Sequence, residues 1–203
     1  MKYFSPMNKK NERSRPPQHF ERLYHANPDP WNFTTSAYER HKYEATLAAL
    51  GTKRFQMALE VGCSIGVLTA RLASRCDKVI GVDFAPSAVA AARSRCAPFP
   101  GVRIEQRQVP RQWPEGQFDL ILFSEILYFL NESDLMQACV HTERSILPGG
   151  LVLLVNYTGL TDDPCSGDTA ASFFIAATAP YLQPILQRRE PNYRLDLLSL
   201  SRP

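Results

Sequence analysis

The chain has 203 residues, enough for one substantial hydrophobic core and fewer than two ordinary domains need. Its formal net charge of +3, without a run of basic residues, argues against nucleic acid or an anionic membrane as a partner. No apolar stretch approaches the ~20 residues of a membrane span, and residues 1–23 lack the apolar core of a signal peptide.

The cysteines indicate neither a disulfide framework nor a zinc site. There are five of them, an odd number, and no two form a C-x-x-C pair. We therefore expect reduced thiols in a cytoplasmic protein, and no bound metal.

The polar, proline-containing residues 1–20 are expected to be poorly ordered. Residues 21–33 are richer in aromatic side chains, and the run Asn27-Pro28-Asp29-Pro30 excludes a regular helix there. Trp31 should therefore stand on a loop, where it could pack over the edge of the core or cover a ligand.

A capping box at Ser36 and Glu39 predicts a helix that stops at Gly51. We expect residues 21–50 to cap a ligand site, because this helix directly precedes the first strand of the core. The polar side chains of its first turns could face the site or form a solvated surface; they are Tyr38, Arg40, His41 and Lys42.

The apolar strand Met57–Val61 leads into a turn that contains Gly62 and Gly66, and a helical pattern follows at once. Such a strand–turn–helix unit is typical of nucleotide-type βαβ folds, where glycine accepts positive φ and leaves room for a ligand. A second strand ends in Asp83, 21 positions after Gly62, close to the ~20 expected for a carboxylate that binds ribose hydroxyls. The alternative is a glycine turn without a ligand.

The glycine pattern of the turn also distinguishes between two classes of cofactor. A dinucleotide turn has the pattern G-x-G-x-x-G, whereas here the next glycine after Gly62 is Gly66. The chain instead has E-x-G-x-S-x-G from Glu60 to Gly66. An acid beside the turn suits a cofactor that carries positive charge and no phosphate.

Strands and helices alternate through the remaining sequence, which predicts a doubly wound parallel sheet in one domain over residues 1–203. The last two strands should form an antiparallel hairpin that ends the sheet. The further strands are expected at 102–105, 118–124, 151–155, 181–189 and 193–201. One helix should end near residue 97, and two more are expected at about 131–146 and 169–179.

Four features in this order resemble class I S-adenosylmethionine (SAM)-dependent methyltransferases. They are Glu60-x-Gly62-x-x-x-Gly66, Asp83, Phe118-Asp119-Leu120-Ile121 and Leu147-Pro148-Gly149-Gly150. The resemblance implies a Rossmann-like, seven-stranded, mostly parallel sheet with an antiparallel last strand. It also implies SAM as the cofactor and S-adenosylhomocysteine as its product.

A narrower resemblance is to the rhizobial nodulation protein S (NodS) group. It rests on Asp29-Pro30-Trp31, on the Glu-Val-Gly-Cys form of the turn, and on the run from Ser124 to Leu130. Members of that group N-methylate the free amine of a deacetylated chitin oligosaccharide. The resemblance therefore implies a small-molecule or oligosaccharide acceptor.

The resemblance to the methyltransferases implies cofactor contacts from the loop before the first strand to the end of the fourth. They are Trp31 and Arg40 over the methionine end, Glu60, Gly62 and Gly66 at the turn, Asp83 on the ribose, Phe84, Gln108 and Val109 around the adenine, and the Ser124 carbonyl on the methionine ammonium. Arg40 would pair with the methionine carboxylate. Gln108 stands where many members have an aspartate; its amide can accept the same hydrogen bond but brings no charge.

The residues after the fourth strand provide the candidates for chemistry. An amine acceptor is protonated at neutral pH, so a base that takes its proton should help methyl transfer. Glu125 is the candidate base, and Tyr128, three positions on, could orient the acceptor. Alternatively, Glu125 is a helix-start carboxylate favoured by the helix dipole.

We therefore expect a SAM-dependent methyltransferase, with the amine of a deacetylated chitin-type oligosaccharide favoured as acceptor. The alternative acceptor is an oxygen or nitrogen of another small metabolite. Two other classes stay open: a NAD-type oxidoreductase, and a module that binds SAM without catalysis.

Overall fold

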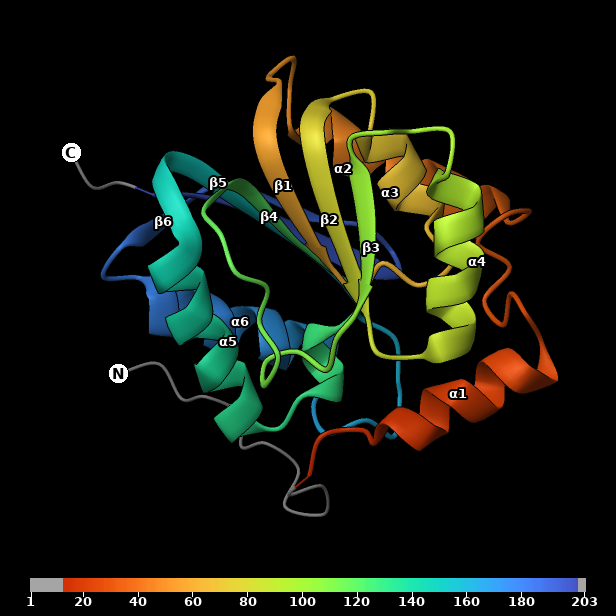
Figure 1. Ribbon diagram of the computed structural model, residues 1–203. Coiled ribbons are helices and arrows are strands. Elements are labelled where there is room, and N and C mark those ends of the chain that lie inside the picture. Colours follow the sequence, from red (N-terminus) through yellow and green to blue (C-terminus); the bar gives the residue numbers. More distant parts are fainter. Residues whose placement is uncertain (1–12, 201–203) are drawn as a thin grey trace.

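The computed structural model describes residues 13–200. Its centre is a seven-stranded sheet in the order β3-β2-β1-β4-β5-β7-β6 (Figure 1). The strands are β1 (Phe55–Val61), β2 (Cys76–Asp83), β3 (Val102–Gln106), β4 (Phe118–Ser124), β5 (Ile146–Tyr157), β6 (Leu182–Arg189) and β7 (Tyr193–Leu200). Strands β1 to β5 pair in parallel, and β7 pairs antiparallel with both β5 and β6. The predicted sheet with an antiparallel last strand is confirmed.

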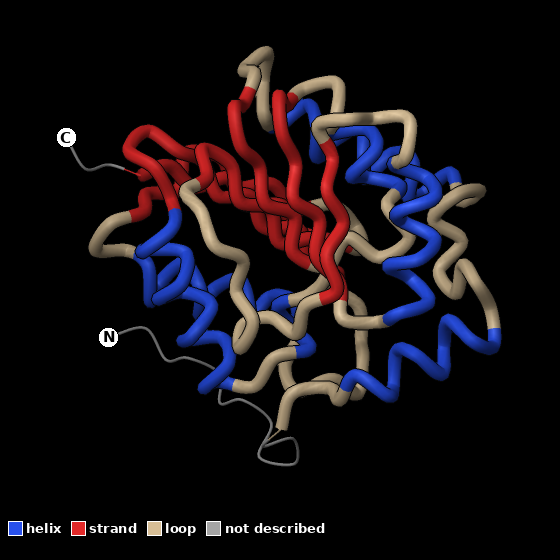
Figure 2. The backbone as a smooth tube through the Cα atoms, viewed as in Figure 1, coloured by secondary structure: helices blue, strands red, loops and turns tan. Residues whose placement is uncertain are grey.

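Helices cover both faces of this sheet (Figure 2). They are α1 (Pro17–Ala26), α2 (Ala37–Ala49), α3 (Val67–Leu72), α4 (Pro86–Cys96), the 3-10 helix η1 (Leu127–Phe129), α5 (Glu132–Ser145) and α6 (Gly167–Thr178). Successive side chains of a strand point to opposite faces. On β4, Leu120 and Leu122 pack in the core on the side of α2 and α3, whereas Ile121 and Phe123 pack on the side of α5 and α6. None of the helices in residues 13–200 is long and apolar enough to cross a membrane.

Helix α1 is the main difference from the sequence prediction, which expected poor order over residues 1–20. Pro17 begins this helix, a favourable place for proline because its missing N–H needs no partner in the first turn. Phe20 and Tyr24 are buried, four positions apart on one face. In Figure 1, α1 lies beyond the end of the sheet at which the parallel strands terminate. Residues 1–12, the rest of that prediction, lie outside the described residues.

Helix α2 begins where the capping box predicted. The Ser36 side chain accepts a hydrogen bond from the Glu39 N–H at 3.3 Å. The buried face of this helix is mainly polar and follows i, i+3, i+4, i+7 spacing, through Glu39, Lys42, Tyr43 and Thr46. A charged face turned inward needs partners from elsewhere in the chain, and the site below supplies them.

Candidate cofactor and acceptor site

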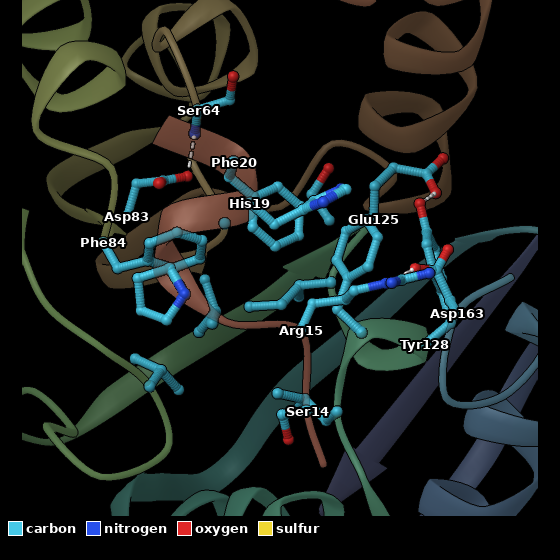
Figure 3. A pocket seen from close by; sticks show the side chains of 18 of the residues that line it. Ser14, Arg15, His19, Phe20, Ser64, Asp83, Phe84, Glu125, Tyr128 and Asp163 are labelled. Atoms are coloured by element: carbon cyan, nitrogen blue, oxygen red, sulfur yellow. Dashed lines mark hydrogen bonds and ion pairs between the residues drawn. The ribbon is translucent and has the colours of Figure 1, made fainter. Parts of the chain in front are cut away.

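A cavity of about 480 Å³ lies at the carboxyl ends of the parallel strands. Ligands of open α/β sheets bind at this edge. Figure 3 shows Ser64 and Asp83 at one end of the cavity, and Glu125 and Tyr128 at the other. Most of the residues predicted to form the site line it, namely Trp31, Gly62, Asp83, Phe84, Gln108, Val109, Ser124, Glu125 and Tyr128.

The glycine turn and Asp83 are held together by backbone hydrogen bonds. Gly62 has a φ of 84°, and a Cβ at this position would lie 3.0 Å from the Ser124 carbonyl oxygen, so any other residue here would be strained and crowded. The Ser64 N–H donates to Asp83 Oδ2 at 3.0 Å, and the Ala85 N–H donates to Oδ1 at 3.0 Å. Burial raises the pKa of Asp83 to about 6, against the opposing effect of these backbone donors. At neutral pH Asp83 is therefore mainly an ionised acceptor on the cavity wall.

Helix α1 provides an aromatic wall that the sequence analysis missed. The Phe20 ring lies 5.1 Å from that of Phe84, and the Tyr24 hydroxyl lies 2.5 Å from Ser64 Oγ. Trp31 packs edge-on against Tyr24, with ring centres 5.6 Å apart, and is 38% exposed. Trp31 thus both packs on its neighbours and lines the cavity. The i, i+3, i+4 spacing of Phe20, Leu23 and Tyr24 could have predicted a helix with this apolar face.

Arg40 does not occupy the place predicted for it. Its side chain is exposed and is not among the cavity residues. Lys42 lines the cavity instead, because α2 turns its polar face inward. Its Nζ donates to Glu125 Oε1 at 2.6 Å and to Glu39 Oε1 at 3.0 Å. Burial disfavours the charged form of Lys42, but the two carboxylates prevail and raise its pKa to about 12.

Glu125 lies where the sequence placed it and is fixed by several donors. Besides Lys42, the Tyr128 hydroxyl donates to Oε2 at 3.0 Å and the Tyr157 N–H donates to Oε2 at 2.7 Å. Burial and the nearby Glu125 carboxylate raise the pKa of Tyr128, so its hydroxyl stays protonated. The side chain is thus bonded to α2, η1 and β5, which is a more extensive role than a helix-start carboxylate would have.

Glu60 and Gly66 lie behind the cavity wall and are not among its lining residues. Glu60 is buried, and its Oε2 accepts a hydrogen bond from the Thr69 hydroxyl of α3 at 2.6 Å. Burial raises the pKa of Glu60 to about 7. A Cβ at Gly66 would lie 3.0 Å from the Ala92 Cα of α4. This glycine permits close packing of the turn against α4, and its approach to the cofactor stays a prediction.

Segments from distant parts of the chain meet over the cavity. Arg15, just before α1, forms ion pairs of 2.7 Å with both Asp162 and Asp163 in the loop after β5. The Arg15 N–H also donates to the Phe129 carbonyl at 2.8 Å. Within residues 13–200, no group of three or more His, Cys, Asp or Glu side chains could hold a metal ion.

The strand order, the glycine turn after β1 and the acid at the end of β2 together define the class I methyltransferase fold. Solved structures agree with this class. NodS, an N-methyltransferase from Bradyrhizobium japonicum WM9 crystallised with S-adenosylhomocysteine, superposes with a TM-score of 0.76 at 22% identity, over 91% of this chain and 98% of that one. A Pseudomonas syringae protein assigned to the methyltransferases is 36% identical, with a TM-score of 0.68, over 81% of this chain and 99% of that one.

The chain belongs to the nodulation protein S (NodS) family, whose sequence model matches residues 18–154. Nodulation protein S of Bradyrhizobium diazoefficiens is 34% identical over 122 residues, which are 59% of this chain and 57% of that protein. The protein of that name from Sinorhizobium fredii is 32% identical over 60% of this chain and 57% of its own length. The matched region thus spans just over half of these relatives. The predicted family resemblance is confirmed.

Proposed function

We propose that this protein transfers a methyl group from SAM to the amine nitrogen of a small molecule. The supporting observation is a cavity at the strand ends with a ribose-type carboxylate, Asp83, at one end and a fixed carboxylate, Glu125, at the other. The N1-methyltransferase for 1,6-didemethyltoxoflavin from Burkholderia thailandensis, 18% identical to this chain, was also solved with S-adenosylhomocysteine. These relatives support SAM as the cofactor.

The residues around the cavity fit the parts of SAM, which supplies an electrophilic methyl group on a sulfonium. Asp83 has free lone pairs for ribose hydroxyls, since a carboxylate can accept about four hydrogen bonds. Phe84 and Val109 provide apolar surface for an adenine ring, and Gln108 lines the same cavity. Gly62 leaves space that any side chain would fill.

The residues at the other end suit an amine acceptor. The Glu125 carboxylate would accept a hydrogen bond from the protonated amine and hold it in place before transfer. Tyr128 and Tyr157 hold this carboxylate at a fixed place. Such positioning of the reacting groups can contribute about 7–11 kcal/mol at best. Because only a neutral amine has a lone pair for the methyl group, we propose that Glu125 then takes one proton from it.

The acceptor class is proposed from the family. Membership in the NodS family favours the free amine of a deacetylated chitin-type oligosaccharide. The cavity of about 480 Å³ is within the range of small-ligand sites, so an oligosaccharide would insert its amine-bearing end. A second candidate is another small metabolite, because a ubiquinone biosynthesis O-methyltransferase of Pseudomonas paraeruginosa is 29% identical over 141 residues.

Two measurements test the proposal. Calorimetric titration should show S-adenosylhomocysteine binding and no NAD binding; the reverse result would overturn the cofactor. Incubation with SAM and deacetylated chitin oligosaccharides should then give a monomethylated product by mass spectrometry. The fully N-acetylated oligosaccharide is the matched control and should remain unchanged. Methylation of both compounds would contradict transfer to the amine.

A further inference from the structure

Helix α2 brings a buried charge cluster to the cavity, and one of its members, Glu39, has no role in the proposed methyl transfer. It consists of Glu39, Lys42 and Glu125, whose side chains are 8%, 5% and 16% exposed. Two carboxylates share one ammonium, so the cluster has one uncompensated negative charge. Such a charge is costly away from water unless a cation or further donors join it.

One oxygen of this cluster lacks a partner. Glu39 is 6% exposed, and its Oε1 accepts the hydrogen bond from Lys42. Its Oε2 is also buried, and no atom of residues 13–200 donates to it. Buried polar atoms in folded proteins are nearly always paired, so an unpaired carboxylate oxygen indicates a missing donor. Burial raises the pKa of Glu39 despite the nearby Lys42, as expected for a carboxylate whose cation is shared.

There is also space for that donor. Glu39 lines the main cavity and a second void of about 30 Å³, whose walls include Glu60, Gly62, Ser124 and Glu125. The two spaces share several of these residues. A void of this size exceeds the ~10–15 Å³ that one water-sized group requires. Its walls carry carboxylates and peptide groups, which suit a small cationic donor.

We propose that Glu39 binds a primary ammonium group in this void. The proposal rests on the proposed function, because SAM carries such a group at its amino-acid end and an amine acceptor carries one at its reacting end. An ammonium would neutralise the cluster and would also donate to Glu39 Oε2. A hydroxyl group would supply the donor without the charge, so the site discriminates in favour of amines.

The test compares ligands that differ in this group. Glu39→Gln keeps the size of the side chain and an acceptor for Lys42, and removes the charge. Calorimetry measures S-adenosylhomocysteine, then 5′-methylthioadenosine, which has the same nucleoside and thioether but no amino-acid end. If the cofactor supplies the ammonium, the variant binds S-adenosylhomocysteine about 10- to 100-fold more weakly and methylthioadenosine equally well.

If the acceptor supplies the ammonium, the affinity for S-adenosylhomocysteine stays the same. Glucosamine, titrated into the methylthioadenosine complex, would then bind the variant more weakly than the wild type. Unchanged affinity for both amine ligands would overturn the proposal and leave only a water in the void. A wild-type protein that binds neither nucleoside would overturn the proposed function, and the role of Glu39 with it.

Two further variants control the result. Glu44→Gln makes the same change on an exposed position of α2 and should alter no affinity. Glu39→Asp keeps the charge but withdraws it by one methylene, so the amine ligand should weaken by an intermediate factor. If Glu39→Gln does not fold and therefore loses methylthioadenosine binding, Glu39→Asp tests the proposal in its place. Full wild-type affinity for the amine ligands in Glu39→Asp would then contradict the proposal.

Discussion

Lys42 on α2 and Glu125 at the end of β4 are 83 positions apart in the sequence and form an ion pair of 2.6 Å. This pair joins the N-terminal part of the chain to the carboxyl edge of the sheet. It also fixes one oxygen of the carboxylate that we propose to meet the acceptor. The position of the candidate base thus depends on a residue that lies outside the strand–turn–helix unit of β1 and α3.

Replacing Lys42 with methionine should destabilise the fold strongly. Removal of the ammonium would leave Glu39 and Glu125 buried without their shared cation. Breaking a buried pair in this way costs about 3–5 kcal/mol of unfolding free energy. Urea denaturation measures it, with Lys78→Met, at an exposed lysine of β2, as the control expected within about 0.5 kcal/mol of wild type. Equal stability of the two variants would contradict the structural role of Lys42.

Asp83 should make cofactor affinity depend on pH. Its pKa of about 6 means that the carboxylate gains a proton, and loses its strength as an acceptor, as the pH falls through 6. Wild-type affinity for S-adenosylhomocysteine should therefore decrease between pH 7.5 and 5. Asp83→Asn should bind roughly 10- to 100-fold more weakly at pH 7.5 and show a flatter profile. Calorimetry over this range checks both, and unchanged affinity in the variant would remove the ribose assignment.

Glu60 should lower the stability of the protein as the pH rises. Its folded-state pKa is raised from 4.5 to about 7, so the folded state keeps a proton that the unfolded state has lost between these values. The stability that comes from this proton is complete below pH 4.5. About 3 kcal/mol of it is lost progressively as the pH rises from 4.5 through 7. Denaturation of wild type and Glu60→Gln at pH 5 and pH 8 isolates this effect.

The glutamine variant should keep the hydrogen bond from Thr69 and lose much less stability over that interval. Glu44→Gln, at an exposed glutamate, should behave as wild type. A pH dependence that is identical in all three proteins would show that Glu60 is ionised at little cost.

Three glycines with positive φ should respond differently to alanine. Gly51 has a φ of 61° and nothing within 4 Å of an added Cβ, so Gly51→Ala should cost only the backbone strain, about 1–2 kcal/mol. Gly66→Ala should cost more stability, because its Cβ meets Ala92. Gly62→Ala should additionally weaken S-adenosylhomocysteine binding, because its Cβ meets the Ser124 carbonyl at the cavity. Urea denaturation and calorimetry separate the two effects, and equal binding by Gly62→Ala and Gly51→Ala would contradict the assignment.

The sheet was predictable because its central strands are apolar on both faces. The run 118–124 is buried on both sides of the sheet, and such a run has few alternatives to a central parallel strand. Asp83 was also placed correctly, since the strand that it ends fixes its position at the carboxyl edge. These predictions depended on local patterns that the tertiary structure left unchanged.

The missed features depend on partners that are distant in the sequence. The buried face of α2 is polar, so hydrophobic periodicity could not distinguish Lys42, which faces Glu125, from Arg40, which faces solvent. Helix α1 begins at the second of two adjacent prolines and has few apolar residues, and the burial of its Phe20 depends on Phe84 and Phe129. Gly66 matches the family motif, but only the position of α4 shows that it serves helix packing.

The position of Trp31 gives the protein a built-in optical reporter. The chain has two tryptophans, and their surroundings differ. Trp31 lies on the cavity wall beside Tyr24, whereas Trp113 stacks on the His141 ring of α5 at 5.3 Å. In Trp113→Phe the indole emission would come from the cavity alone. Ligand arrival and departure could then be followed by stopped-flow fluorescence in the otherwise unlabelled protein, which would resolve the order in which cofactor and acceptor bind.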